Sequence, residues 1–297
     1  MRNQLLAFVL ALSLAGPAFA NSNKADLSSL ARQAVSEEAN ESATAIEALR
    51  AAGPAGFAAF VSAHHDAIEA RRKEIASDHP PAASAAWQRV SYAMDLVAGQ
   101  KDSFASGLFW YTDFAQARAA ARLSGKPILS LRLLGRLDEE LSCANSRFFR
   151  LTLYANQDIS RLLKEGFILH WQSVRPVPKV TIDFGDGRRL ERTLTGNSIH
   201  YVLDSRGRVI DALPGLYGPR AFARELMRAA GVADQAAQAT TDDERTALLR
   251  DYHNTRLQEL ALGWASDLSR AVINLTTAKA ATPASAASAK PPRADAQ

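Results

Sequence analysis

Apolar residues recur at helical spacing through the N-terminal part of the chain, from residue 24 to residue 100. Positions three and four apart share one face of a helix, so this spacing predicts amphipathic helices. Gly53-Pro54 and Pro80-Pro81 interrupt the pattern, because proline cannot continue a helix and glycine weakens one. The region is therefore predicted to be a helical domain or arm of three helices. Their apolar faces are formed by Leu27, Leu30, Ala34 and Val35, by Phe57, Phe60, Val61 and Ile68, and by Trp87, Val90, Met94 and Val97.

The pattern changes near residue 106, where short apolar runs begin to alternate with helical stretches. Ile128–Leu134 is an apolar run of strand length, which is typical of a buried strand. Residues 176–195 alternate on both sides of a Gly-Asp-Gly turn and predict an inserted β-hairpin. Over residues 106–231 the order of elements predicts an α/β domain, a central mixed sheet flanked by helices. The predicted strands outside the hairpin are 128–134, 167–171, 199–204 and 209–213, and the last helix begins at Pro219 and ends before Gly231.

The first twenty residues have the pattern of a secretory signal peptide. Arg2 provides the positive start, Leu5–Ala15 is a short apolar run, and Ala18-Phe19-Ala20 offers small residues for cleavage. No later stretch approaches the roughly 18 apolar residues of a membrane helix. We therefore expect an exported protein, periplasmic or secreted, without a membrane span.

The C-terminal part is predicted to hold a helical segment and a tail. Residues 240–274 have amphipathic spacing that predicts one or two helices. From residue 276 to residue 297 the chain consists mostly of Ala, Ser, Pro and Lys without an aromatic residue. Such a composition cannot bury enough apolar surface to fold, so this tail is predicted to be disordered.

The composition bears on function through its charge distribution and, above all, through its single cysteine. The chain has 297 residues, 47% of them apolar, and its net charge of +4 comes from interspersed acidic and basic residues. No block of Lys and Arg alternates with aromatic residues, so nucleic-acid binding is not expected. Cys143 is the single cysteine, which excludes an internal disulfide. Its thiol is a buried apolar group, a free reactive group, or half of an intermolecular bond.

A series of short motifs between Trp110 and Gly231 resembles the thioredoxin-like superfamily, specifically exported proteins with a thioredoxin domain. The resemblance implies a thioredoxin-like fold and places the family's reactive thiol at Cys143. The flanking helical segments lie outside it. The motifs are Trp110-Tyr111-Thr112-Asp113, Gly125-Lys126-Pro127-Ile128, Cys143-Ala144-Asn145-Ser146, the run from Val202 to Ile210, and Leu213-Pro214-Gly215.

The chain departs from this family at two positions. The redox motif of the family is Cys-x-x-Cys, and here the second cysteine is replaced by Ser146. Without a resolving thiol, the chain cannot complete a dithiol–disulfide cycle by itself. The cis-proline of the family corresponds to Ser198, preceded by Asn197. A cis bond before a non-proline residue costs about 2.5–4 kcal/mol, so we expect a trans peptide there.

The candidate catalytic residues are Cys143 and Ser146, and Asn197, Ser198 and Arg147 are expected to border the site. A thiol at the start of a helix faces unpaired amides and the positive end of the helix dipole, which favour the thiolate. We expect Ser146 to donate a hydrogen bond to the sulfur and Arg147 to add positive charge. Such a monothiol could form a mixed disulfide or a sulfenic acid, or shuffle disulfides, with a protein or a low-molecular-weight thiol as partner.

The histidines are weaker candidates. His64 and His65 point about 100 degrees apart on a helix, so neither a metal nor another cofactor is expected. His170 and His200 are interpreted as structural residues of strands.

Two functions stay open at this point. The first is monothiol redox or isomerase-like activity through Cys143, favoured by the position of the cysteine at a helix start. The second is a non-catalytic thioredoxin-fold scaffold that binds a partner through its helices and hairpin, favoured by the missing second cysteine and the missing proline. The substrate, the partner and the oligomeric state are not encoded in any pattern of the sequence.

Overall fold

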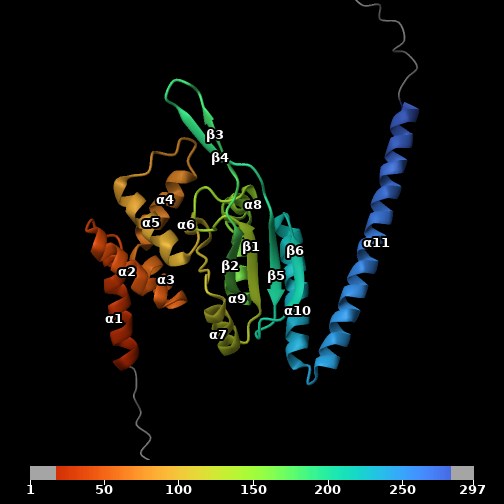
Figure 1. The fold of residues 1–297 in the computed structure, drawn as a ribbon, viewed down its shortest axis with the longest axis horizontal. Helices are drawn as coiled ribbons and strands as arrows, with labels where there is room; N and C mark the ends of the chain where they lie inside the picture. Colours follow the sequence, from red (N-terminus) through yellow and green to blue (C-terminus); the bar gives the residue numbers. More distant parts are fainter. Residues whose placement is uncertain (1–17, 282–297) are drawn as a thin grey trace, which may run out of the picture. The chain divides into compact units, whose positions relative to one another are not determined.

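The structure is a computed structural model that describes residues 18–281, with side chains over residues 26–272. The chain divides after Ala237 into two compact units, and each is described by itself. Residues 1–17, with most of the predicted signal peptide, and residues 282–297, with most of the predicted tail, lie outside the described residues. Figure 1 shows the helical region, the sheet and its hairpin of the first unit, and the single long helix of the second.

The helical region predicted over residues 24–100 is made of more, shorter helices than the sequence indicated. The predicted first helix is two helices separated by a turn at residues 34–38, and the predicted second helix breaks at His64. Shorter helices can fold back on one another and bury their apolar faces in one core, around Leu49, Phe60 and Val97. The helices are α1 (Ala18–Gln33), α2 (Ala39–Ala51), α3 (Pro54–Ala63), α4 (His65–Ile75), α5 (Ala85–Ala98) and the short α6 (Ser103–Ser106).

One glycine permits the close packing of this region. A Cβ atom on Gly56 of α3 would lie 2.0 Å from the carbonyl oxygen of Leu49 in α2. Because a backbone atom cannot move aside as a flexible side chain can, only glycine fits at this crossing. The two helices therefore pack backbone against backbone.

The second part of this unit is a four-stranded mixed sheet with the strand order β2-β1-β5-β6. β1 is parallel to β2 and antiparallel to β5, and β5 is antiparallel to β6. The predicted α/β class, a central mixed sheet flanked by helices, is confirmed. The strands are β1 (Ile128–Leu134), β2 (Ile168–Arg175), β5 (Ser198–Leu203) and β6 (Val209–Pro214).

Helices pack on both faces of the sheet. On one face, His200 of β5 contacts the rings of Phe149 and Phe222. On the other face, Phe114 contacts His170 of β2. The Asp113 side chain caps the helix of Phe114 by accepting from Gln116 N, 3.0 Å away. The helices are α7 (Phe114–Ser124), α8 (Ala144–Phe148), the π-helix η1 (Phe149–Leu153), α9 (Gln157–Gly166) and α10 (Pro219–Gln238).

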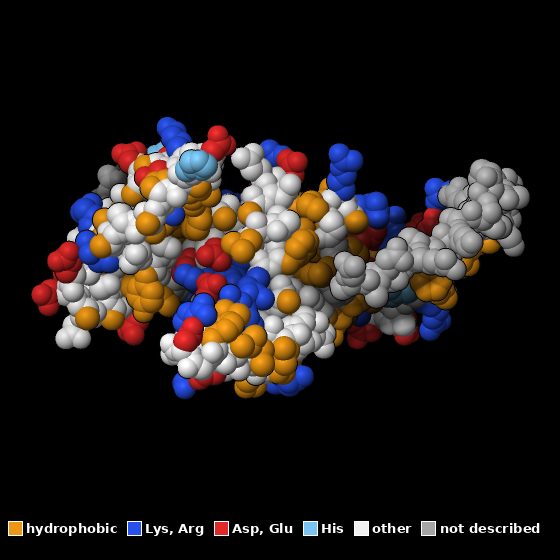
Figure 2. All heavy atoms as spheres, turned by 90° about the horizontal axis from the view of Figure 1, so that it is seen from above, with side chains coloured by type: hydrophobic (Ala, Val, Ile, Leu, Met, Phe, Trp, Pro, Cys, Tyr) orange, Lys and Arg blue, Asp and Glu red, His pale blue; other side chains and the backbone are white. Residues whose placement is uncertain are grey.

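The predicted hairpin forms a separate two-stranded sheet, β3 (Lys179–Asp183) and β4 (Arg189–Thr193). It is held at its end by surface ion pairs, among them Arg189–Asp183 at 2.9 Å. The apolar side chain of Phe184 at the turn is exposed. On the face of the molecule shown in Figure 2, acidic and basic side chains are intermixed, as the sequence predicted.

The last helix of this unit is longer than predicted. The sequence indicated an end before Gly231, but α10 continues through that glycine to Gln238. Glycine within a helix costs about 1 kcal/mol relative to alanine. Beyond it, Val232, Ala233 and Ala236 are buried. Their burial continues the packed face that begins at Phe222 and offsets the glycine.

The second unit is one helix, α11 (Asp242–Ala281). The sequence predicted one or two helices ending by residue 274, with a disordered tail from residue 276. Residues 276–281 are instead helical, and this correction follows from the high helix propensity of their alanines. Within residues 18–281, no helix combines the length and the apolar character needed to cross a membrane.

Candidate functional site

Cys143 is the N-cap residue of α8, in the connection that follows β1. Its backbone is extended, with φ −62° and ψ 161°, and its side chain makes no capping hydrogen bond. The Sγ atom lies 3.9 Å from the carbonyl oxygen of Asn197, to which the thiol donates a weak hydrogen bond. The hydrogen bond of the thiol is therefore made to the segment before β5 and not to the first turn of α8.

Residues 193–198, which we call the covering segment, hold the cysteine inside the protein. The amide N–H of Ala144 donates to the carbonyl oxygen of Thr195 at 3.2 Å. Asn145 Nδ2 donates to Ser198 Oγ at 2.9 Å. The cysteine side chain has an exposed fraction of 0%. Two hydrogen bonds thus fix the covering segment against the start of α8, and the sulfur is inaccessible to solvent.

The structure brings three of the five predicted site residues together. Asn197 accepts from the thiol of Cys143, and Ser198 Oγ accepts from Asn145, two residues further along. The peptide bond between Asn197 and Ser198 is trans, since residues 18–281 contain no cis peptide. Ser146 is buried, but its hydroxyl has no hydrogen-bond partner among the described residues. The predicted hydrogen bond from Ser146 to the sulfur is therefore wrong, and the thiol is instead hydrogen-bonded to the carbonyl oxygen of Asn197. Arg147 is half-buried and has no ion pair within the described part of the chain.

The helix after the cysteine changes type after one turn, from α8 to the π-helix η1. The N–H of Tyr154 donates to the carbonyl oxygen of Phe149 at 2.7 Å, which is the spacing of a π-helix. Arg150 in this π-turn is only 1% exposed, and its Nη1 lies 2.7 Å from Asp102 Oδ2. The π-turn thereby joins the sheet domain to the end of the helical region.

Asp102 belongs to a small network of charges where the π-helix η1 meets the helical region. Among the described non-glycine residues, only Asp102 has a positive φ, 59°. Burial raises the pKa of Asp102, while the guanidinium of Arg150 opposes that shift. Burial also lowers the pKa of Arg150. Close by, Asp95 accepts from Lys101 Nζ at 3.0 Å and from the N–H of Ser103 at 2.8 Å. Because each charged side chain has an oppositely charged partner, we interpret the network as structural, although Arg150 Nε has no hydrogen-bond partner among the described residues.

The two strand histidines are buried and structural, as the sequence indicated. His170 Nδ1 lies 2.8 Å from Ser130 Oγ, and burial together with the charge of Arg132 lowers its pKa to about 4. His200 Nε2 lies 2.6 Å from the hydroxyl of Tyr154, and burial lowers its pKa to about 3. Both rings are therefore neutral near pH 7.

The adjacent histidines of the helical region separate in the structure. His64 Nε2 lies 2.8 Å from the carbonyl oxygen of Ala31, whereas His65 is exposed. Within the described residues, no three His, Cys, Asp or Glu side chains are grouped closely enough to hold a metal ion.

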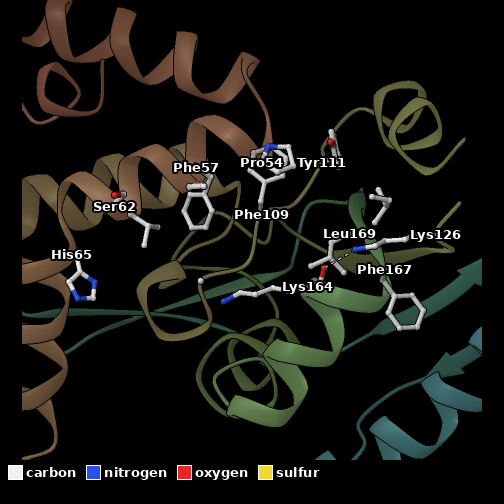
Figure 3. A pocket seen from close by; sticks show the side chains of 14 residues that line it. Pro54, Phe57, Ser62, His65, Phe109, Tyr111, Lys126, Lys164, Phe167 and Leu169 are labelled. Atoms are coloured by element: carbon white, nitrogen blue, oxygen red, sulfur yellow. Dashed lines mark hydrogen bonds between the residues drawn. The ribbon is translucent and has the colours of Figure 1, made fainter. Parts of the chain in front are cut away.

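A second site, which the sequence did not reveal, lies between the helical region and the start of β2. It is a cavity of about 820 Å³, a volume within the range of small-molecule sites. We call it the Lys164 pocket (Figure 3). Its walls are mostly apolar and include Phe57, Val61, Phe109, Phe167, Ile168 and Leu169.

Four separate parts of the chain line the Lys164 pocket: helices α3 and α4, the connection at residues 107–111, Lys126, and residues 164–169. The connection is held against β2 by hydrogen bonds from Tyr111 N to Leu169 O at 2.8 Å and from Trp171 N to Tyr111 O at 3.1 Å. No local pattern relates these parts to one another, so sequence periodicity could not have found the pocket.

Comparison with protein-family models, with curated proteins and with solved structures finds no match to this chain.

Proposed function

We propose that this chain is an exported, thioredoxin-like protein that acts as a binding scaffold and does not exchange thiols. The mixed sheet flanked by helices, with a cysteine that opens the helix after β1, supports a thioredoxin-like fold. The signal-peptide pattern of residues 1–20 supports export. The Lys164 pocket, built partly from the added helices, supports a binding role.

One observation carries the choice of binding over thiol exchange: the sulfur of Cys143 is 0% exposed. Thiol–disulfide exchange requires a second sulfur to approach the attacking thiolate directly. The covering segment occupies that approach, with the carbonyl oxygen of Asn197 as the nearest polar contact of the thiol. A buried free cysteine behaves as a small apolar residue.

Alkylation of the full chain tests this proposal. In native buffer, iodoacetamide is expected to leave Cys143 unlabelled over an hour, whereas in concentrated urea it is expected to label the residue fully, as read by intact mass. Leu123 is 91% exposed. The Cys143→Ala, Leu123→Cys double variant therefore shows that the reagent labels an exposed thiol under native conditions. Rapid native labelling of Cys143 would overturn the scaffold proposal.

Monothiol exchange is the second candidate, and the unpartnered, buried hydroxyl of Ser146 favours it. If the covering segment opened, Ser146 would be free to donate to a thiolate at Cys143. The thiolate would then attack a disulfide RSSR, forming a Cys143–SR mixed disulfide and releasing RS⁻, with no net change in electrons. Incubation with glutathione disulfide distinguishes the candidates, since only exchange adds the mass of glutathione to the native protein.

A further inference from the structure

The Lys164 pocket combines apolar walls with a concentration of positive charge. Lys126 and Lys164 both line it, and none of the described lining residues is acidic. Lys126 Nζ donates to the carbonyl oxygen of Lys164 at 3.3 Å, whereas Lys164 Nζ has no hydrogen bond or ion pair among the described residues. In Figure 3 the Lys164 side chain extends toward the space below Phe57. The pocket thus presents an uncompensated ammonium group beside an apolar cavity.

Lys164 is exposed, and its ammonium group lies close to Gly107. A Cβ atom on Gly107, which has φ +60°, would lie 2.9 Å from Lys164 Nζ. Glycine suits this position because its φ is positive. Although the Lys164 side chain is exposed, partial desolvation of its ammonium group and the positive charge of Arg72 lower the pKa of Lys164. The negative charge of a bound anion would oppose this shift, because an opposite charge nearby favours the protonated ammonium.

We propose that the Lys164 pocket binds a fatty-acid-like carboxylate, with its apolar chain against Phe57 and Phe109 and its carboxylate at Lys164. This inference rests on the proposed binding function and names the class of ligand. The apolar walls exclude a small hydrophilic anion, because such an anion would lose its hydration without gaining apolar contact. The two lysines disfavour a cationic amphiphile of the same chain length, because like charges repel.

The probe is dodecanoate, titrated calorimetrically into the full chain below the concentration at which it forms micelles. We expect saturable binding, and binding that weakens by roughly fourfold for each methylene removed from the chain. Dodecyltrimethylammonium has the same apolar chain with the opposite charge and is expected to bind at least about tenfold more weakly. Equal binding of the anion and the cation, or no binding of dodecanoate, would overturn the proposal.

Three variants locate the site. Lys164→Met is expected to weaken dodecanoate binding at least about tenfold, because it removes a charged hydrogen-bond donor. Lys73 of α4 is exposed and does not line the pocket, so Lys73→Met is the matched control and is expected to bind as the wild type does. Ala58→Trp places a large ring in the pocket from an exposed helix position and should abolish binding. Undiminished binding in both Lys164→Met and Ala58→Trp would contradict this location.

The experiments distinguish a failure of the scaffold proposal from a failure of the proposed ligand class. Binding is expected to be unchanged in Cys143→Ala, because the cysteine does not line the pocket. If dodecanoate does not bind while Cys143 resists alkylation, only the ligand class is wrong. If Cys143 is alkylated rapidly while dodecanoate still binds, only the scaffold proposal is wrong.

Discussion

Acid should destabilise this protein through His200, a ring held neutral in the core. The imidazole is 0% exposed and contacts the rings of Phe149 and Phe222 at centroid distances of 4.8 and 5.0 Å. Nε2 lies 2.6 Å from the hydroxyl of Tyr154, and Nδ1 has no partner within the described residues. Protonation would place a positive charge in a site closed to water, and this desolvation lowers the pKa of His200 to about 3.

The size of the effect follows from proton linkage. In the unfolded chain the imidazole of His200 titrates near its reference value of about 6.5. Between that value and the folded pKa of about 3, the unfolded state binds a proton that the folded state does not. Stability contributed by the neutral ring is therefore present above about pH 6.5 and is lost as the pH falls toward 3. From pH 7.5 to pH 5.0 the expected loss is about 2 kcal/mol in the free energy of unfolding.

This loss is measured by urea unfolding monitored by circular dichroism. The wild type and His200→Gln are each unfolded at pH 7.5 and at pH 5.0. Glutamine stays neutral at both pH values and can still hydrogen-bond to Tyr154, so its loss on acidification should be smaller by about 2 kcal/mol. His79 is exposed. His79→Gln removes an imidazole outside the core, so it is the matched control and should keep the wild-type difference. If His200→Gln and the wild type lose the same free energy, the neutral buried ring is not the cause.

Two further predictions concern the Arg150–Asp102 ion pair and the covering segment. Arg150 is 1% exposed and its partner Asp102 is 22% exposed. Asp102→Asn should therefore lower the free energy of unfolding, measured with urea, by about 3–5 kcal/mol, because it leaves the buried charge of Arg150 unpaired. Arg150→Met should lower it clearly less, because it removes that charge. A larger loss in Arg150→Met than in Asp102→Asn would refute this reasoning. A Cβ atom on Gly196 would lie 2.1 Å from Asn145 Oδ1. Gly196→Ala should loosen the covering segment and speed native alkylation of Cys143 about tenfold, equivalent to roughly 1.4 kcal/mol in the opening free energy, and an unchanged rate would contradict the role of the segment.

The sequence determined the elements, because their signals are local. The apolar run Ile128–Leu134 forms β1, and the Gly-Asp-Gly turn joins the two strands of the hairpin, both as predicted. Local signals failed where packing decided the outcome. α10 continues past Gly231 because the residues beyond it are buried, and the helix after the cysteine takes a π-turn that brings Arg150 to Asp102.

Tertiary structure alone decided the properties of the sites. The sequence placed Cys143 at the start of a helix, but its burial depends on Asn197, which lies 54 positions further along the chain. The charge state of His200 likewise depends on rings from other elements. The Lys164 pocket joins parts of the chain that only folding brings together. Spacing along the chain can assign a residue to a helix or a strand, whereas exposure, desolvation and the lining of a cavity depend on distant residues that no periodic pattern identifies.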